Sequence, residues 1–204
     1  MKVSITLAVV VLLATFCVAQ TPTLPAPAVN RVDVFAGYSY LDQNAHINFS
    51  DGAGNFFHSF TGGLNGGNLG ATLNLNKTFG LKADFSAWTG GGNFTTSSKQ
   101  YELAFGPVIG WRKGNWHPAV ELLAGVGHRN ASGFGFKGGQ NTFAGIAGVI
   151  VDYRVRPHFT LRPIEARYMW NNWQNVTIPK LFSSWNSGSG QSNFSVNTGV
   201  VVTF

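Results

Sequence analysis

Apolar and polar residues alternate one by one through most of this chain, and this two-residue period restricts its fold more than any other feature. The final stretch, NFSVNTGVVVTF, carries an apolar residue or a threonine at every second position back from Phe204. Side chains of a β-strand point to its two faces in turn, so this pattern predicts a strand with one apolar face. The pattern recurs in residues 31–42, 64–76, 80–90, 99–112, 116–129, 141–154, 158–170 and 192–204.

The connections between these segments fall into two classes that alternate along the chain. NKTFG, RKGN and RPH are tight turns, whereas four longer connections are rich in Gly, Asn and Ser. Short turns at one end and long loops at the other are typical of a barrel in an outer membrane. We therefore predict an all-β fold, an eight-stranded antiparallel up-and-down transmembrane β-barrel with both chain ends on the periplasmic side. The predicted long loops are residues 43–63, 91–98, 130–140 and 171–191.

The N-terminal residues predict export followed by an extended linker. MKVSITLAVVVLLATFCVAQ has a positive start at Lys2, a long apolar run and a small residue at Ala19, which is the layout of a signal peptide. Past this segment no apolar run approaches the roughly 20 residues of a transmembrane helix. A mature chain that spans a membrane must then be a closed barrel, because lipid leaves unpaired backbone groups unsatisfied. The predicted parts are a signal peptide (1–19), a Pro-rich periplasmic linker (20–30) and an outer-membrane β-barrel (31–204).

The two faces of the predicted strands differ in chemistry. One parity is apolar, as in Leu69, Leu103 and Leu122, and we assign it to lipid, whereas the other parity carries six of the eight acidic residues. The alternative is a soluble barrel or sandwich with the polar parity in solvent. Aromatic residues weigh against that alternative, because they gather near both strand ends as at two membrane interfaces. The predicted girdles are Phe79, Trp111, Trp116, Tyr153, Phe159 and Phe204 near the turns, and Tyr38, Tyr40, Trp88, Tyr101, Tyr168 and Trp170 near the long loops.

Several stretches also carry a family resemblance: VDVFAGYSYL, FGLKADFSAW, FGPVIGWR, VELLAGVGHR, FAGIAGVIVDYRV, LRPIEARYMW and the final GVVVTF. Together they resemble the small eight-stranded barrels related to the barrel domain of outer-membrane protein A. The resemblance implies an antiparallel barrel in the outer membrane of a Gram-negative bacterium, in contact with its lipid and lipopolysaccharide. It also implies that the chain end is a signal read by the barrel-assembly machinery. That signal would be Phe194, Val196, Val200, Val202 and Phe204.

The inner parity is the first candidate functional site. An eight-stranded barrel has an interior just wide enough to be filled by side chains, so we expect its charged residues to pair as a plug. The alternative is a gate whose partners exchange and let small ions through. Arg162 has the wrong parity for this face unless Pro163 introduces a bulge, as a proline inside a strand often does. The predicted inner polar core is Asp33, Lys82, Asp84, Glu102, Glu121, Asp152, Arg162, Glu165 and Arg167.

The histidines are a second candidate. GHRNASG places His128 at the extracellular end of its strand with Ser132 close behind, and some barrels of this size modify lipids. A Ser/His hydrolase needs an acid to orient the imidazole, but Gln140 and Asn141 stand where one would be needed. The other histidines lack a carboxylate or Cys at metal-ligand spacing, so we expect neither a metal nor a cofactor. Scattered basic residues, despite a formal charge of +6, also argue against nucleic-acid binding.

The aromatic residues of the two longest loops, 43–63 and 171–191, are a third candidate. Exposed aromatics among small polar residues can anchor an extracellular ligand, or can pack on each other and on lipopolysaccharide. These residues are Phe56, Phe57, Phe60, Trp173, Phe182 and Trp185. The sequence thus predicts a non-enzymatic outer-membrane β-barrel with an envelope-structural or surface-interaction role. The alternatives are a narrow low-conductance porin-like channel gated by the inner charged residues and, third, a lipid A acyl-ester hydrolase.

Overall fold

The computed structural model describes most of the chain beyond its N-terminal region. The described residues are 32–51, 54–92, 96–133, 136–172, 176–178, 183–185 and 191–204. The predicted signal peptide and linker therefore lie outside the described residues. No helix among the described residues is long and apolar enough to cross a membrane.

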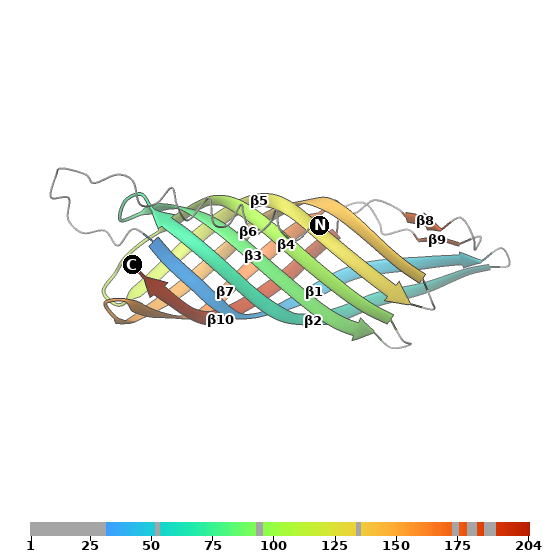
Figure 1. Cartoon of the computed structure of the whole chain (residues 1–204), viewed down its shortest axis with the longest axis horizontal. Coiled ribbons are helices and arrows are strands. Elements are labelled where there is room, and N and C mark those ends of the chain that lie inside the picture. Colours follow the sequence, from blue (N-terminus) through green and yellow to red (C-terminus); the bar gives the residue numbers. More distant parts are fainter. Residues whose placement is uncertain are drawn as a thin grey trace, which may run out of the picture.

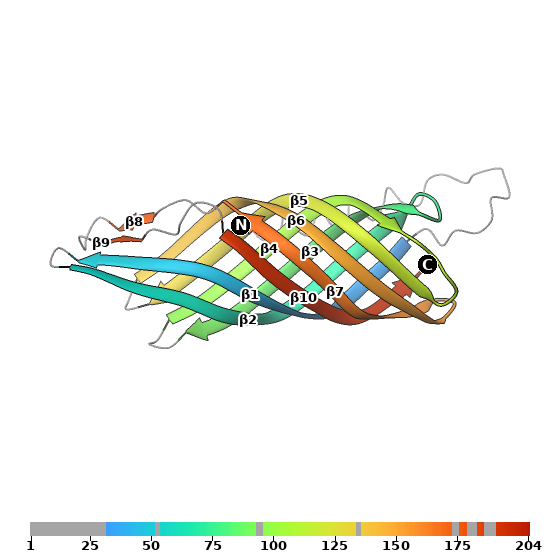
Figure 2. The same cartoon turned by 180° about the vertical axis from the view of Figure 1, so that it is seen from behind.

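Eight antiparallel strands close into one barrel, which confirms the predicted fold class (Figures 1 and 2). Going around the barrel, each strand pairs with the strands that precede and follow it in this set, and β10 pairs with β1. Closure gives each of these strands a neighbour on both sides within the barrel wall. The strands are β1 (Val32–Asp51), β2 (Gly54–Asn74), β3 (Phe79–Gly92), β4 (Thr96–Gly110), β5 (Trp116–Gly133), β6 (Phe136–Arg156), β7 (Phe159–Asn171) and β10 (Gln191–Thr203).

The seam between β1 and β10 depends on a pair of glycines. Gly37 is paired with Gly199, and the two strands are locked at the chain end by Phe204 N–H donating to the Val32 carbonyl at 2.9 Å. A Cβ on Gly199 would lie only 2.5 Å from the Gly37 Cα, and a Cβ on Gly37 would lie 2.5 Å from the Phe35 ring. Glycine inside a strand often marks such a close approach of two backbones. The seam is therefore tight where a side chain would force the strands apart.

The strands run further than predicted at the end that carries the long connections. Residues 43–63 were expected to be a loop, but β1 and β2 continue as a paired hairpin up to Asp51 and Gly54. Figure 1 shows this hairpin reaching well beyond the other strands. The prediction of a loop was wrong because paired strands outside lipid do not need an apolar face, so their polar composition does not distinguish them from a loop.

The other long connections are also shorter than expected. Strands extend into residues 91–98 and 130–140 and leave only 93–95 and 134–135 between them. Within 171–191 the structure has two further short strands, β8 (Val176–Ile178) and β9 (Ser183–Trp185), which pair with each other. β9 lies beside β1, at the same end as the long hairpin.

The three short connections lie at the opposite end, together with Phe204. In the first of them the side-chain oxygen of Asn76 accepts hydrogen bonds from the N–H groups of Thr78 and Phe79, each at 2.8 Å. In the second, Gly114 adopts a φ of 63°, which glycine allows at low cost. These local features fix the turns that the sequence predicted.

The apolar parity faces outward along the barrel wall. Leu69, Leu103 and Leu122 are each more than half exposed, and so are Trp111 and Trp116 at the short-turn end. At the hairpin end Tyr168 and Trp170 are exposed as well. Trp88 is an exception, and its assignment to the upper girdle was wrong. Its side chain is 2% exposed and its indole N–H donates to Ser39 Oγ at 2.7 Å inside the barrel. Trp88 has the inner parity of β3, which outweighs its position near the strand end.

Pro163 lies at a bulge in β7, as the parity of Arg162 required. The pairing of β7 with β10 shifts between Asn197 and Gly199. Pro163 and Ile164 are both exposed, so Arg162 and Glu165 both face the interior although they are three residues apart. The bulge therefore adds a second guanidinium, beside that of Arg167, to the inner face of β7.

Candidate functional site

A compact network of buried charges crosses the lumen. Lys82 of β3 donates to Glu165 at 2.6 Å and to Glu121 at 2.8 Å, and its ammonium lies 3.4 Å from Asp84. Arg167 of β7 donates hydrogen bonds to both carboxylate oxygens of Asp84, at 2.8 and 2.7 Å, and its Nε donates to Glu121 at 2.8 Å. Bidentate guanidinium–carboxylate contacts of this kind are among the stronger hydrogen bonds in proteins.

Arg162 joins the network at its edge nearest the short turns. Its Nε and Nη2 donate to the two oxygens of Asp152 at 2.7 and 3.0 Å, and its Nη1 donates to Glu165 at 3.2 Å. The guanidinium also lies 4.5 Å from the centroid of the Phe35 ring, within the range of a cation–π contact. Thus Glu165 is shared by Lys82, Arg162 and Arg167.

Seven of the nine predicted core residues belong to this network, and two lie apart from it. Asp33 is half-buried near the short turns and accepts a hydrogen bond from Asn74 at 2.8 Å. Glu102 is buried nearer the hairpin end, and among the described residues it forms no ion pair with the network. The network itself joins three bases to four acids, so it is almost neutral. Buried charges persist when they are matched in this way.

An apolar layer lies directly beyond the charges, on the hairpin side, and was not predicted from the sequence. It consists of buried side chains that contact one another inside the barrel: Leu41, Leu64, Trp88, Ala104, Leu123, Ile146 and Met169. Along their strands, Leu123 and Met169 are two residues closer to the hairpin end than Glu121 and Arg167. The parity of these residues was readable from the sequence, but an inner face was expected to be polar throughout.

A second polar layer follows on the hairpin side of the apolar layer. Gln100, Arg129 and Asn171 are all buried there, and Arg129 Nη2 lies 3.4 Å from Gln100 Oε1. Glu102 belongs to the same layer. The lumen is therefore filled in three successive layers: charged, apolar and polar.

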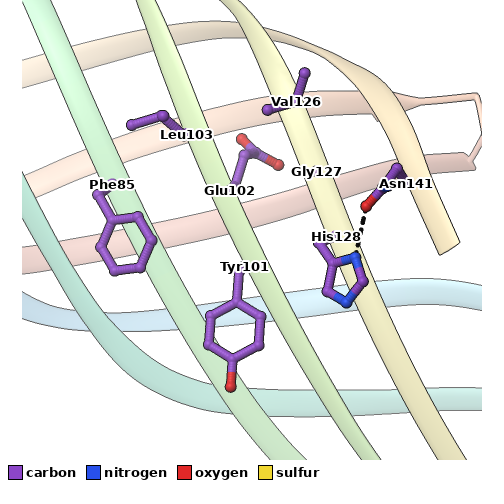
Figure 3. A pocket seen from close by; sticks show the side chains of 8 residues that line it. All are labelled: Phe85, Tyr101, Glu102, Leu103, Val126, Gly127, His128 and Asn141. Carbon is purple, nitrogen blue, oxygen red and sulfur yellow. Dashed lines mark hydrogen bonds between the residues drawn. The ribbon is translucent and has the colours of Figure 1, made fainter. Parts of the chain in front are cut away.

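A groove on the outer wall is a separate candidate site (Figure 3). It spans β3 to β6, has a volume of about 350 Å³ and is open to the outside of the barrel. The outward side chains that line it are Phe85, Tyr101, Leu103, Val126, His128 and Asn141. Glu102 and Gly127 also line it, although they have the inner parity of their strands.

His128 is held in a fixed position at the groove. Its Nδ1 lies 2.6 Å from Asn141 Oδ1, and its ring stacks against Tyr101 with 6.5 Å between centroids. The partner of the imidazole is thus an amide and not the carboxylate that a Ser/His hydrolase uses. The side chain of Ser132 lies outside the described residues. Among the described residues, no three His, Cys, Asp or Glu side chains are grouped to hold a metal ion.

The predicted assembly-signal residues all lie on the outward face of β10 and at its end. Phe194, Val202 and Phe204 are 47%, 37% and 69% exposed, and Val196 and Val200 are half-buried between them. The predicted loop aromatics cannot be placed in the same way. Trp173 and Phe182 lie outside the described residues, and the side chains of Phe56, Phe57, Phe60 and Trp185 do so although their backbones belong to β2 and β9.

Comparison with known proteins shows the fold. No protein-family model and no curated protein sequence matches the chain. The structure is similar to Neisserial surface protein A, with a TM-score of 0.57 at 15% identity, covering 85% of this chain and 97% of that chain. It is similar to the outer membrane protein OprG from Pseudomonas aeruginosa, with a TM-score of 0.50 at 12% identity, covering 85% and 95% of the two chains.

A third similar structure is that of Ail, the attachment invasion locus protein of Yersinia pestis, in complex with the heparin analogue sucrose octasulfate. Its TM-score is 0.50 at 15% identity, covering 84% of this chain and 99% of that chain. All three similar structures are thus matched over nearly their whole length. The chain therefore has the fold of the small eight-stranded outer-membrane barrels.

Proposed function

We propose that this chain is a non-enzymatic barrel of a bacterial outer membrane, with a closed lumen, that serves the envelope structurally or as an interaction surface. The filled lumen is the observation that carries the proposal. A path for ions would have to pass the charged network, in which Lys82 and Arg167 are fully engaged with acids. It would then have to pass the apolar layer, which offers no hydrogen bonds to a hydrated ion.

The outward apolar wall supports the location. It is apolar in its middle and carries exposed Trp and Tyr side chains at both ends, which fits a bilayer between two interfaces. Small barrels place short turns at the periplasm and long connections outside the cell. We therefore orient the β1–β2 hairpin toward the extracellular side, where it and the β8–β9 pair offer a surface to an extracellular ligand.

Conductance tests the closed lumen directly. We expect the purified barrel in planar bilayers to show no single-channel steps, because both layers remain filled. The variant Glu102→Gln should behave identically, since Glu102 lies outside the charged network and can be changed without breaking it. Discrete steps in the wild type that Glu102→Gln alters would support the porin-like channel and overturn the proposal.

Shortening the hairpin separates the surface role from the barrel. Residues Ala45–Phe60 can be replaced by an Asn-Gly turn that joins the paired residues Asn44 and Thr61. Cells displaying the full chain and this variant would be compared for binding to immobilised heparin, because the similar structure of Ail is in complex with a heparin analogue. Binding that is lost with the hairpin would assign the surface role, whereas unchanged binding would argue against it.

The exposed ring of Phe204 leads to a third prediction, about assembly. We expect Phe204→Ala to reduce the amount of folded barrel in cells several-fold, because assembly machinery would read this outward ring. Refolding of the same variant from urea into detergent micelles should be unchanged. Phe159→Ala is the control, since Phe159 is also exposed at the short-turn end of the barrel. If both variants lose the same amount of folded barrel in cells, or if Phe204→Ala also refolds less well in micelles, Phe204 would act only as a girdle residue and not as an assembly signal.

A further inference from the structure

The outer-wall groove combines an apolar floor with a polar rim, and its interpretation rests on the proposed membrane location and orientation. Phe85, Leu103 and Val126 supply apolar surface in the part nearer the middle of the wall. Tyr101, His128 and Asn141 supply hydroxyl, imidazole and amide groups toward the hairpin end. The groove is therefore amphiphilic along the membrane normal, as a bound lipid would be.

The polar rim continues toward the hairpin end on the same face. Lys99 is the next outward residue of β4 beyond Tyr101, and it is exposed and paired across the sheet with Asn130. Asn130 in turn follows His128 on the outward face of β5, and it lies close to Gly139 of β6. A cation and neutral hydrogen-bonding groups thus lie on the hairpin side of the apolar floor. The one carboxylate residue that lines the groove, Glu102, has the inner parity.

The chemistry of the rim fits a sugar that carries an anionic group. Because His128 Nδ1 is engaged with Asn141, its Nε2, which points away from that bond in Figure 3, is left to accept a hydrogen bond from a hydroxyl. The Tyr101 hydroxyl can donate or accept. Lys99 supplies the positive charge for a phosphate. Stacking on Tyr101 keeps the imidazole in place before any ligand arrives.

We propose that this groove is a binding site for one molecule of lipid A, the phosphorylated glycolipid of lipopolysaccharide. One acyl chain lies along Phe85, Leu103 and Val126, and the phosphorylated sugar lies at His128 and Lys99. The orientation of the barrel places the rim in the outer leaflet, where lipopolysaccharide is the main lipid. The volume of about 350 Å³ is within the range of small-ligand sites and suits one chain with part of a headgroup.

Filling the groove tests the acyl-chain contact. Wild type and Leu103→Trp would be purified in detergent and titrated with lipid A, with the bound lipid counted by native mass spectrometry. We expect Leu103→Trp to bind about tenfold more weakly, because the indole occupies the floor. Leu122→Trp is the matched control, since Leu122 is equally exposed, at 57% against 56%, but lies outside the groove. Equal binding by both variants would overturn the site.

The headgroup is tested with the same barrel and three lipids. Wild type should prefer lipid A to its dephosphorylated form and to phosphatidylglycerol, and Lys99→Gln should lose the preference for the phosphorylated form. Equal binding of all three lipids by the wild type would overturn lipid A as the ligand. Cell fractionation distinguishes this failure from that of the proposed function. A chain absent from the outer membrane would refute the location, whereas a chain present there without lipid A selectivity would refute only the groove.

Discussion

Replacing Arg167 by alanine is expected to lower the free energy of unfolding by about 3 to 5 kcal/mol, because the change leaves buried carboxylates without a counter-charge. Arg167 is fully buried and donates to Asp84, Glu121 and Glu165. With three bases and four acids in the network, losing one base leaves a net charge of about −2 in the lumen if all remain ionised. Urea unfolding of the barrel in liposomes, followed by tryptophan fluorescence and by gel mobility without heating, measures the loss.

Two variants control for the Arg167 result. Arg156→Ala removes an exposed guanidinium at the end of β6 and should change stability by no more than about 0.5 kcal/mol. Glu121→Gln removes one acid from a network that has one acid too many, so it should cost less than Arg167→Ala. If Glu121→Gln proves as damaging as Arg167→Ala, the hydrogen-bond geometry would matter more than the charge balance.

The second large effect is expected at the seam. Gly199→Val should destabilise the barrel by about 3 kcal/mol or more, because the new side chain meets backbone atoms of β1 that cannot move without separating the strands. We expect most of the protein to lose the mobility shift between heated and unheated samples. The backbone hydrogen bonds between Val32 and Phe204 join the same two strands, so β1 and β10 have little freedom to move apart.

The matched control for the seam is Ala36→Val. Ala36 is next to Gly37 but faces outward, where a β-branched side chain has room and suits a strand. Its mobility shift and urea midpoint should match those of the wild type. A folded, heat-modifiable Gly199→Val barrel would mean that the β1–β10 contact can widen, and that the glycine pair is not required for closure.

The sequence predicted the architecture because period-two patterning and turn residues are local signals. Each strand of the barrel showed its outward face in residues such as Leu103 and Leu122, and the turn at Asn76 showed its own capping chemistry. Even the bulge was foreseeable, since Arg162 could face inward only if Pro163 broke the register. None of these inferences needed to know which strands face one another across the lumen.

The partners inside the barrel could not be predicted in this way. Asp84 and Arg167 are 83 residues apart and meet only because closure brings β3 and β7 to opposite sides of a narrow lumen. The position of Trp88 was mistaken for a different reason: its inner parity was readable from the sequence, but its place near the strand end was given more weight. The groove was also missed, because it requires side chains from four strands to leave a space together.

The apolar layer has a consequence for how the barrel folds. Each of the seven strands β1 to β7 contributes one side chain to it, so a hairpin such as β1–β2 holds only two of the seven, here the paired Leu41 and Leu64. Bringing residues as distant in sequence as Leu41 and Met169 into one layer costs a large loop-closure entropy before the layer stabilises the barrel. Folding intermediates should therefore be sparsely populated. The curling of strands β1 to β7 into a sheet and the pairing of β10 with β1 and β7 should occur in a single cooperative step. We therefore expect folding kinetics closer to those of a two-state globular protein than to those of independently forming hairpins.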